Sequence, residues 1–151
     1  MQKEEWSEPD KRHRRVRAGL ALAARDSSER ARATSEFQKN LRNRTKVFAL
    51  RIVRMFSVLP KTTEAQVLGK QLLRSGTSIG ANYREAFRAR SKAEFIAKCG
   101  DSLREIEESA YWLELLVESG IASAEKLAPL RQECEELTAI FVTILKRAKT
   151  S

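Results

Sequence analysis

From about Leu41 to the C-terminus, hydrophobic residues recur every three or four positions and polar residues fill the intervals. This spacing is typical of amphipathic helices, because it places the apolar side chains on one face of a 3.6-residue turn. The period is interrupted near Pro60, Ser91 and Gly120. The pattern therefore predicts four consecutive helices.

The predicted helices carry recognisable end signals. The first ends before Pro60, because proline disfavours helical backbone in the residue that precedes it. One of the threonines at 62 and 63 can cap the second helix, which extends to about position 87. Ser91 and Glu94 form a capping box at the start of the third, which ends at Gly120. The fourth extends from about Ser123 to position 148.

The two C-terminal helices have regular apolar seams. In the third the seam contains Ile96, Cys99, Leu103, Ile106, Ala110, Leu113 and Val117. In the fourth it contains Leu127, Leu130, Cys134, Leu137, Phe141, Ile144 and Ala148. Two helices that pack nearly parallel share this period of about 3.5 residues. With short connections, the four helices predict an all-α, antiparallel up-down four-helix bundle.

Residues 1–39 differ from the rest of the chain. They are polar, contain the single histidine, His13, and show no sustained apolar period. Such a segment cannot bury enough apolar surface to offset the entropy lost on ordering. We therefore expect a flexible basic arm at 1–39, disordered or weakly helical, before a bundle domain at 40–151.

The second predicted helix contains the small-residue stretch "QLLRSGTSIGAN" at 71–82. At about 100° per residue, one row collects Gly69, Gly76, Gly80, Tyr83 and Phe87. A glycine inside a helix costs about 1 kcal/mol relative to alanine. Three in one row favour close approach of another helix, in this chain or in a neighbouring copy. A phosphate-binding loop is disfavoured, because the glycine-lysine-hydroxyl ending and a preceding strand are missing.

A polar set, Ser75, Ser78, Asn82 and Glu85, accompanies this row. Ser75 and Asn82 fall on positions that face the bundle core. A buried amide requires hydrogen-bond partners. Asn82 either bonds Ser78, Glu85 or a neighbouring helix and fixes the register, or lines a small polar pocket with Glu85.

The charge is unevenly distributed along the chain. The sequence has 29 lysines and arginines against 20 acidic residues, a net charge of +9. Residues 45–92 carry ten basic and two acidic side chains, whereas 99–136 carry three basic and ten acidic ones. A basic surface attracts acidic partners such as nucleic acid. The nucleic-acid-binding candidates are Lys70, Arg74, Arg84, Arg88, Arg90, Lys92, Arg51 and Arg54, which Arg44 and Lys46 could extend. Alternatively, these cations pair with the acidic helix faces of the same or an adjacent subunit.

The outer face of the third helix suggests self-association. Trp112, Leu115 and Leu116 lie opposite its core seam. Large apolar groups on an outer face are typical of interfaces, although they could also pack within a compact monomer. A basic half and an acidic half would suit a head-to-tail ring.

Catalytic and metal-dependent classes are disfavoured. A di-metal carboxylate bundle needs Glu-x-x-His on two helices, whereas Glu105 and Glu108 have no histidine beside them. Nucleophile and base pairs also lack a base, because His13 lies outside the predicted bundle. We expect no catalytic residue, metal or cofactor, and we identify no small-molecule substrate.

Cys99 and Cys134 fall in the core seams, where we expect buried thiols. Around a hairpin at Gly120 they would lie about 12 Å apart along the helix axis, too far for a disulfide. Two cysteines do not make a disulfide framework, which favours a cytoplasmic location. No apolar run approaches the roughly 20 residues that a membrane-spanning helix needs.

Four segments carry a resemblance to a known family: "FALRIVRMF", "QLLRSGTSIGANYREA", "SKAEFIAKCGDSLREIEESAYWLELL" and "CEELTAIF". Over about 40–151 the chain resembles the bacterial four-helix-bundle proteins of the 23S ribosomal-RNA intervening-sequence family. The positions that match the family motifs are Gln71, Arg74, Ser75, Ser78, Asn82, Glu85, Glu105, Glu108 and Trp112. Tyr83 and Phe87 depart from the pattern, because smaller or aliphatic residues are expected there.

The resemblance implies an up-down bundle that assembles into a homopentameric ring. A related retroelement accessory protein has a similar fold and binds nucleic acid through a basic surface. We therefore expect a non-catalytic oligomer that binds nucleic acid, RNA being favoured. Specificity should be low, because no base-reading module is recognisable. The alternative is a protein-only scaffold whose basic and acidic faces pair with each other or with a partner protein.

Overall fold

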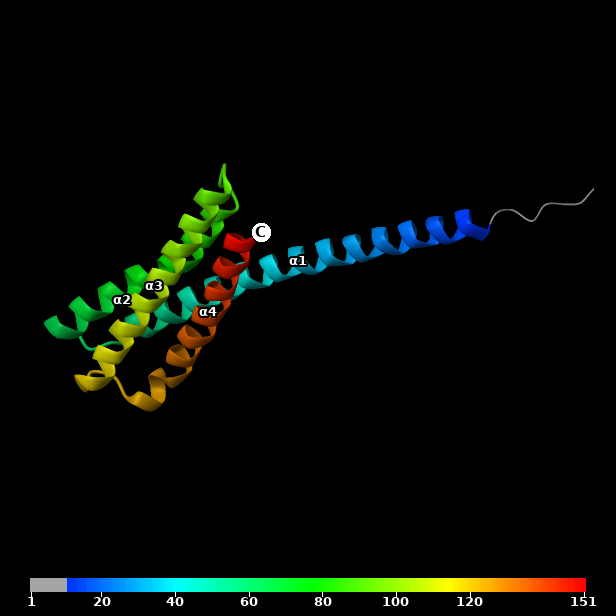
Figure 1. The fold of residues 1–151 in the computed structure, drawn as a ribbon. Helices are drawn as coiled ribbons and strands as arrows, with labels where there is room; N and C mark the ends of the chain where they lie inside the picture. Colours follow the sequence, from blue (N-terminus) through cyan, green and yellow to red (C-terminus); the bar gives the residue numbers. More distant parts are fainter. Residues whose placement is uncertain (1–10) are drawn as a thin grey trace, which may run out of the picture. The chain divides into compact units, whose positions relative to one another are not determined.

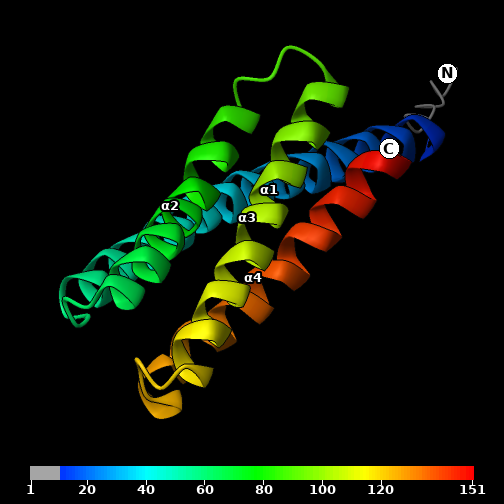
Figure 2. The same ribbon diagram turned by 90° about the vertical axis from the view of Figure 1, so that its left-hand side faces the viewer.

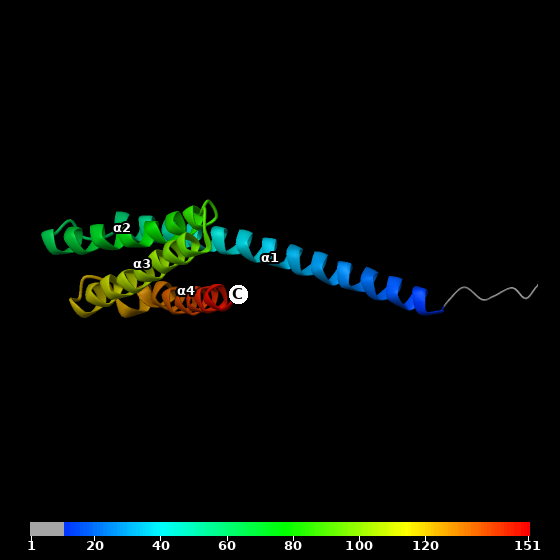
Figure 3. The ribbon, with the colours of Figure 1, turned by 45° about the horizontal axis from the view of Figure 1, so that its top comes forward.

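The computed structural model describes the backbone of residues 11–151 and the side chains of residues 25–151. The described residues form four helices: α1 (Lys11–Ser57), α2 (Thr63–Ala86), α3 (Lys92–Glu118) and α4 (Ala124–Thr150) (Figure 1). From α2 onward, successive helices are antiparallel (Figure 2), and α3 packs against both α2 and α4 (Figure 3). The predicted all-α bundle is confirmed.

The start of α1 differs from the sequence prediction. We expected the first helix near Leu41, whereas the structure has helical backbone from Lys11. Residues 11–40 are rich in alanine and arginine, which favour helix without an apolar stripe. Contacts within the chain divide it between Asn40 and Leu41, and the bundle is the unit that follows this boundary. The part of the predicted arm at 1–10 lies outside the described residues, as does the side chain of His13.

Side-chain caps fix where the later helices begin. The hydroxyls of Thr62 and Ser123 accept hydrogen bonds from backbone N–H groups in the first turns of α2 and α4. The cap on α2 and the start of α4 next to Ser123 agree with the predictions. Ser91 caps α3 by accepting from the N–H of Glu94 at 3.1 Å. The Glu94 carboxylate accepts from the N–H of Arg90 at 2.8 Å, one residue before the position that a capping box requires. The box is therefore only half formed.

The connection from α3 to α4 depends on one left-handed residue. Gly120 has a φ of 76°, the conformation that glycine adopts without steric cost. The N–H of Ile121 then bonds the carbonyl of Leu116 at 3.1 Å and closes the end of α3. The predicted helix stop at Gly120 is confirmed.

The core agrees with the predicted seam in α4 and differs from it in α3. The first five seam positions of α4, from Leu127 to Phe141, are buried. In α3 the buried row is Cys99, Ser102, Ile106, Ser109, Leu113 and Leu116, whereas Ile96, Leu103, Ala110 and Val117 are only half-buried. Two serines thus occupy positions that an apolar pattern does not mark. Phe48 and Ile52 of α1 enter the same core, and so does Leu59, which follows the end of α1.

Candidate nucleic-acid interface

The glycine row of α2 faces α1 of the same chain. A Cβ added to Gly69 would lie 2.6 Å from the Leu59 side chain, and one added to Gly76 would lie 2.9 Å from Ile52. One added to Gly80 would lie 3.6 Å from a backbone carbonyl carbon of α1. Real Cβ atoms do not approach other atoms to 2.6 or 2.9 Å, so a larger residue at Gly69 or Gly76 would not fit. The glycines therefore permit a close contact between helices. The row is a packing surface inside the bundle.

Serines make the contact between α2 and α3. Ser75, Ser102 and Ser109 are fully buried. The hydroxyls of Ser75 and Ser109 lie 2.9 Å apart, and Ser102 donates to the backbone carbonyl of Ile79 at 2.9 Å. Buried hydroxyls need such partners. Ser75 occupies the polar core as expected, whereas its partners on α3 were missed.

The remaining polar-core residues lie further out. Glu85 is exposed and forms a 2.7 Å ion pair with Lys98, which corrects its expected place in the core. Asn82 is half-buried. Ser78 donates to the carbonyl of Arg74 at 2.6 Å and not to Asn82. The bonds expected from Asn82 to Ser78 or Glu85 are absent from the hydrogen bonds of the described side chains. The polar pocket expected at Asn82 and Glu85 stays a prediction.

Aromatic rings extend the glycine row toward the other helices. Tyr83 is buried, with edge-to-face contacts to Phe87 at 4.9 Å and to Phe141 of α4 at 5.5 Å between ring centres. Burial raises the pKa of the Tyr83 hydroxyl to about 12. Phe87 is 41% exposed and also meets Phe95 of α3, edge to face, at 6.2 Å. These two departures from the family pattern thus join α2 to α3 and α4.

The outer face of α3 is less apolar than the sequence suggests. Leu116 is fully buried within this chain, which corrects its expected place on the outer face. Leu115 and Trp112 are half-buried. The Trp112 indole N–H donates to the Glu108 carboxylate at 3.2 Å, and its ring packs against the exposed Tyr111 at 5.2 Å.

Several of the candidate cations have partners within the chain. The Arg74 guanidinium bridges Glu105, at 3.4 Å, and Glu108 of α3. Its hydrogen bond holds the pKa of the Glu108 carboxyl below its usual range. The Lys92 ammonium donates to the backbone carbonyl of Ser151. Arg74 and Lys92 are thus already engaged.

On α1, Arg44 pairs with two carboxylates of α4, Glu133 at 2.7 Å and Glu136 at 2.9 Å. This cation, which the sequence offered as an extension of the basic surface, is therefore neutralised within the bundle. The acidic segment of the chain absorbs part of the basic charge, as the scaffold alternative anticipated.

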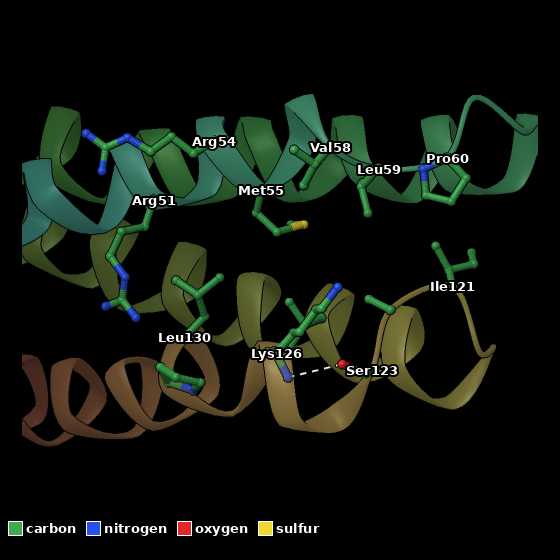
Figure 4. Close-up of a pocket in the computed structure, with 13 residues that line it drawn as sticks. Arg51, Arg54, Met55, Val58, Leu59, Pro60, Ile121, Ser123, Lys126 and Leu130 are labelled. Carbon is green, nitrogen blue, oxygen red and sulfur yellow. Dashed lines mark hydrogen bonds between the residues drawn. The ribbon is translucent and has the colours of Figure 1, made fainter.

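Four candidate cations on α2 and in the turn after it remain without such partners. Lys70, Arg84, Arg88 and Arg90 are exposed. Among the described residues, none of their side chains forms an ion pair or hydrogen bond. The other two candidates, Arg51 and Arg54, line a pocket between α1 and α4 to which α2 contributes no residue (Figure 4). The eight candidates therefore form no single surface.

The two thiols are buried, as the seam positions predict. Cys99 and Cys134 are free cysteines in the core. Burial raises the pKa of the Cys99 thiol to about 11 and that of Cys134 to about 12. Thiols with such pKa values are protonated near neutral pH and therefore poor nucleophiles.

Among the described residues, no group of three or more histidine, cysteine or carboxylate side chains could hold a metal ion. Over the same part of the chain, no helix is both long and apolar enough to cross a membrane.

Comparison with known proteins identifies the family. Residues 38–143 match the family model described as 23S rRNA-intervening sequence protein. The chain belongs to this family. A crystal structure of a protein of unknown function from the S23 ribosomal protein family of Bacteroides thetaiotaomicron is 38% identical, with a TM-score of 0.68. The match covers 72% of this chain and 97% of that protein. No protein with a curated description matches the chain.

Proposed function

We propose that the chain is a non-catalytic, homo-oligomeric helical bundle that binds nucleic acid, RNA being favoured, by electrostatics and with little sequence specificity. The observation that carries the proposal is the row of unpaired cations on the outer face of α2. Lys70 and Arg84 are exposed there, and the exposed Arg88 and Arg90 follow in the turn after α2. RNA phosphates would supply the negative charge that the chain does not. The family description, which names 23S rRNA, supports RNA as the nucleic acid.

Exposed apolar residues of α1 support self-association. Val47, Leu50 and Val53 belong to the bundle unit, and each is more than 40% exposed. A second copy could cover them, because exposed apolar groups close together on one helix are typical of interaction surfaces. The resemblance to the family implies a pentameric ring. Such a ring would repeat the cations of α2 and multiply weak phosphate contacts.

A protein-only scaffold is the second candidate, and the ion pairs of Arg74 and Arg44 favour it. Both arginines bridge two carboxylates of another helix. In this alternative, Arg84 and Arg88 would pair in the same way with acidic residues of another subunit or of a partner protein. Nucleic acid would then have no role.

RNA binding by the full chain tests the proposal. We would determine the particle mass by light scattering and titrate labelled single-stranded RNA between about 50 and 200 mM salt, a range over which phosphate contacts weaken strongly. We expect an oligomer, binding that weakens steeply with salt, and a loss of at least about tenfold in affinity for Arg84→Glu/Arg88→Glu.

The matched control is Arg131→Glu/Lys146→Glu, which reverses two exposed charges on α4. It should retain most of the affinity for RNA. Equal losses in both variants would indicate a response to net charge alone, and absence of binding at low salt would overturn the proposal in favour of the scaffold. A monomer would contradict the oligomer in both candidates.

A further inference from the structure

A pocket of about 500 Å³ lies between the end of α1 and the start of α4 (Figure 4). Thirteen residues line it, from Arg51 to Pro60 on one side and from Ile121 to Leu130 on the other. Its volume falls within the range of about 300–1,000 Å³ that is typical of small-molecule sites. All of its lining belongs to the bundle unit.

The charges around this pocket are not balanced. Arg51, Arg54 and Lys126 line it, and none of the thirteen lining residues is acidic. Among the described residues, none of these three side chains forms an ion pair or a side-chain hydrogen bond. Arg51 is half-buried, so its charge is only partly hydrated. Figure 4 shows Arg51 and Lys126 extending from opposite walls into the space between the helices, with Arg54 directed away from it.

The pocket wall on α4 explains the imbalance. Two turns before Arg51, Arg44 meets Glu133 of α4 at 2.7 Å. Figure 4 shows Arg51 beside Leu130 and Lys126 further along α4, toward Ser123. None of the lining residues on this stretch is a carboxylate, so neither cation meets an ion-pair partner there.

The remaining lining is aliphatic apart from Ser123, whose hydroxyl accepts a hydrogen bond from the N–H of Lys126. Met55, Leu59, Leu127 and Leu130 form the apolar walls, with two prolines at the edge. The lining contains no aromatic ring on which a base could stack and no side-chain amide that could read its edge. An alkyl chain needs neither, because it is held by apolar contact alone.

We propose that this pocket binds an aliphatic carboxylate. The carboxylate accepts charge-assisted hydrogen bonds from Arg51, the half-buried cation of the pocket, and Lys126 adds positive charge toward the other end. The alkyl chain packs over Met55, Leu127 and Leu130. This site goes beyond the proposed RNA binding and does not depend on it, because no residue of α2 contributes to it.

Calorimetric titration of the full chain with decanoate tests the site. We expect one decanoate to bind per chain. Decanol has the chain without the charge, and acetate has the charge without the chain, so each should bind at least about tenfold more weakly. Equal affinity for decanol, or no binding of decanoate, would overturn the proposal.

Two variants separate this site from a general effect of charge. Lys126→Glu replaces a positive charge of the pocket with a negative one, so it should weaken decanoate binding at least about tenfold and leave the free protein equally stable to heat. The control Arg131→Gln/Lys146→Gln removes two exposed cations of α4 outside the pocket and should bind decanoate as the wild type does. Unchanged binding in Lys126→Glu would overturn the proposal. A changed particle mass in Lys126→Glu, with no decanoate binding to the wild type, would overturn it in favour of a contact between copies.

Discussion

The two sides of α1 within the bundle unit pack in different ways. Toward α2, Ile52 and Leu59 lie against glycines, with no room for an added methyl group. Toward α4, long charged side chains meet instead, and the contact changes along its length from the Arg44 ion pairs to the pocket around Arg51. The contact with α2 rests on shape, because apolar side chains fill the space beside the glycines. The contact with α4 contains ion pairs at Arg44 and a pocket at Arg51, where the lining holds no carboxylate.

This difference separates structural residues from candidate binding residues. The glycines of α2 and the serines between α2 and α3 lie inside the bundle, where their small size permits close packing. The unpaired cations lie elsewhere, on the outer face of α2 and in the pocket. Substitutions on the closed contacts should therefore change stability, and substitutions of the unpaired cations should change binding.

The largest effect is expected at the closed contact with α1. Gly76→Leu should lower the free energy of unfolding by about 1–3 kcal/mol, because the side chain would overlap Ile52 in a filled core. Denaturant unfolding followed by circular dichroism measures this. Gly100 is the matched control, because nothing lies within 4 Å of an added Cβ. Gly100→Ala should raise stability by up to about 1 kcal/mol. Equal effects in the two variants would contradict the close contact.

The serine contact between α2 and α3 should give a smaller effect. Ser102→Ala removes the hydrogen bond to the Ile79 carbonyl and should lower the free energy of unfolding by about 0.5–1.5 kcal/mol. Ser119→Ala, at the exposed end of α3, is the comparison and should change stability by less than about 0.5 kcal/mol. The same denaturant series measures both. A loss at Ser119 as large as that at Ser102 would show that burial at the contact is not the cause.

The contact with α4 can be tested by comparing two arginines on one face. Arg44→Gln should lower the free energy of unfolding by up to about 1 kcal/mol, since this partly exposed cation meets two carboxylates. Arg51→Gln should change the free energy of unfolding by less than about 0.5 kcal/mol, because among the described residues this cation has no ion-pair partner to lose. Thermal unfolding of both variants at low salt measures the difference. The reverse order would contradict the ion pairs of Arg44.

The smallest effect concerns Arg74 and depends on pH. The Glu108 carboxyl has a lowered pKa in the folded chain, so its pairing adds stability above the unfolded value of about 4.5 and loses it as the pH falls below that value. Arg74→Gln should thus cost less than about 1 kcal/mol at pH 7. The difference from the wild type should disappear in acid, as denaturant unfolding at several pH values would show. A difference that persists at the lowest pH would exclude this ion pair as the cause.

Local signals predicted most helix boundaries in the bundle. Thr62, Ser123 and Gly120 act within a few residues of their position, so their roles can be predicted without knowledge of the tertiary fold. The apolar seam of α4 could also be predicted, because large apolar side chains that recur at the helical period indicate a buried helix face.

Other features depended on contacts between distant segments. Ser102 and Ser109 were missed because their partners lie on α2, which a pattern within α3 does not show. The Arg44 pairs and the pocket at Arg51 follow from the register between α1 and α4, which a pattern within either helix does not specify. The early start of α1 was missed for another reason. Its first residues favour helix by their intrinsic propensity, but they show no apolar period in the sequence from which a helix could be predicted.

The salt dependence of RNA binding tests the central claim most directly. Lys70→Gln/Arg84→Gln/Arg88→Gln removes three unpaired cations of α2, and Lys146→Gln/Arg147→Gln/Lys149→Gln removes three exposed cations of α4. Each cation that contacts a phosphate of single-stranded RNA contributes about 0.7 to the slope of log affinity against log salt. The account predicts that the α2 variant flattens this slope by about 2 for each engaged chain and that the α4 variant leaves it unchanged. An unchanged slope in the α2 variant would contradict the account.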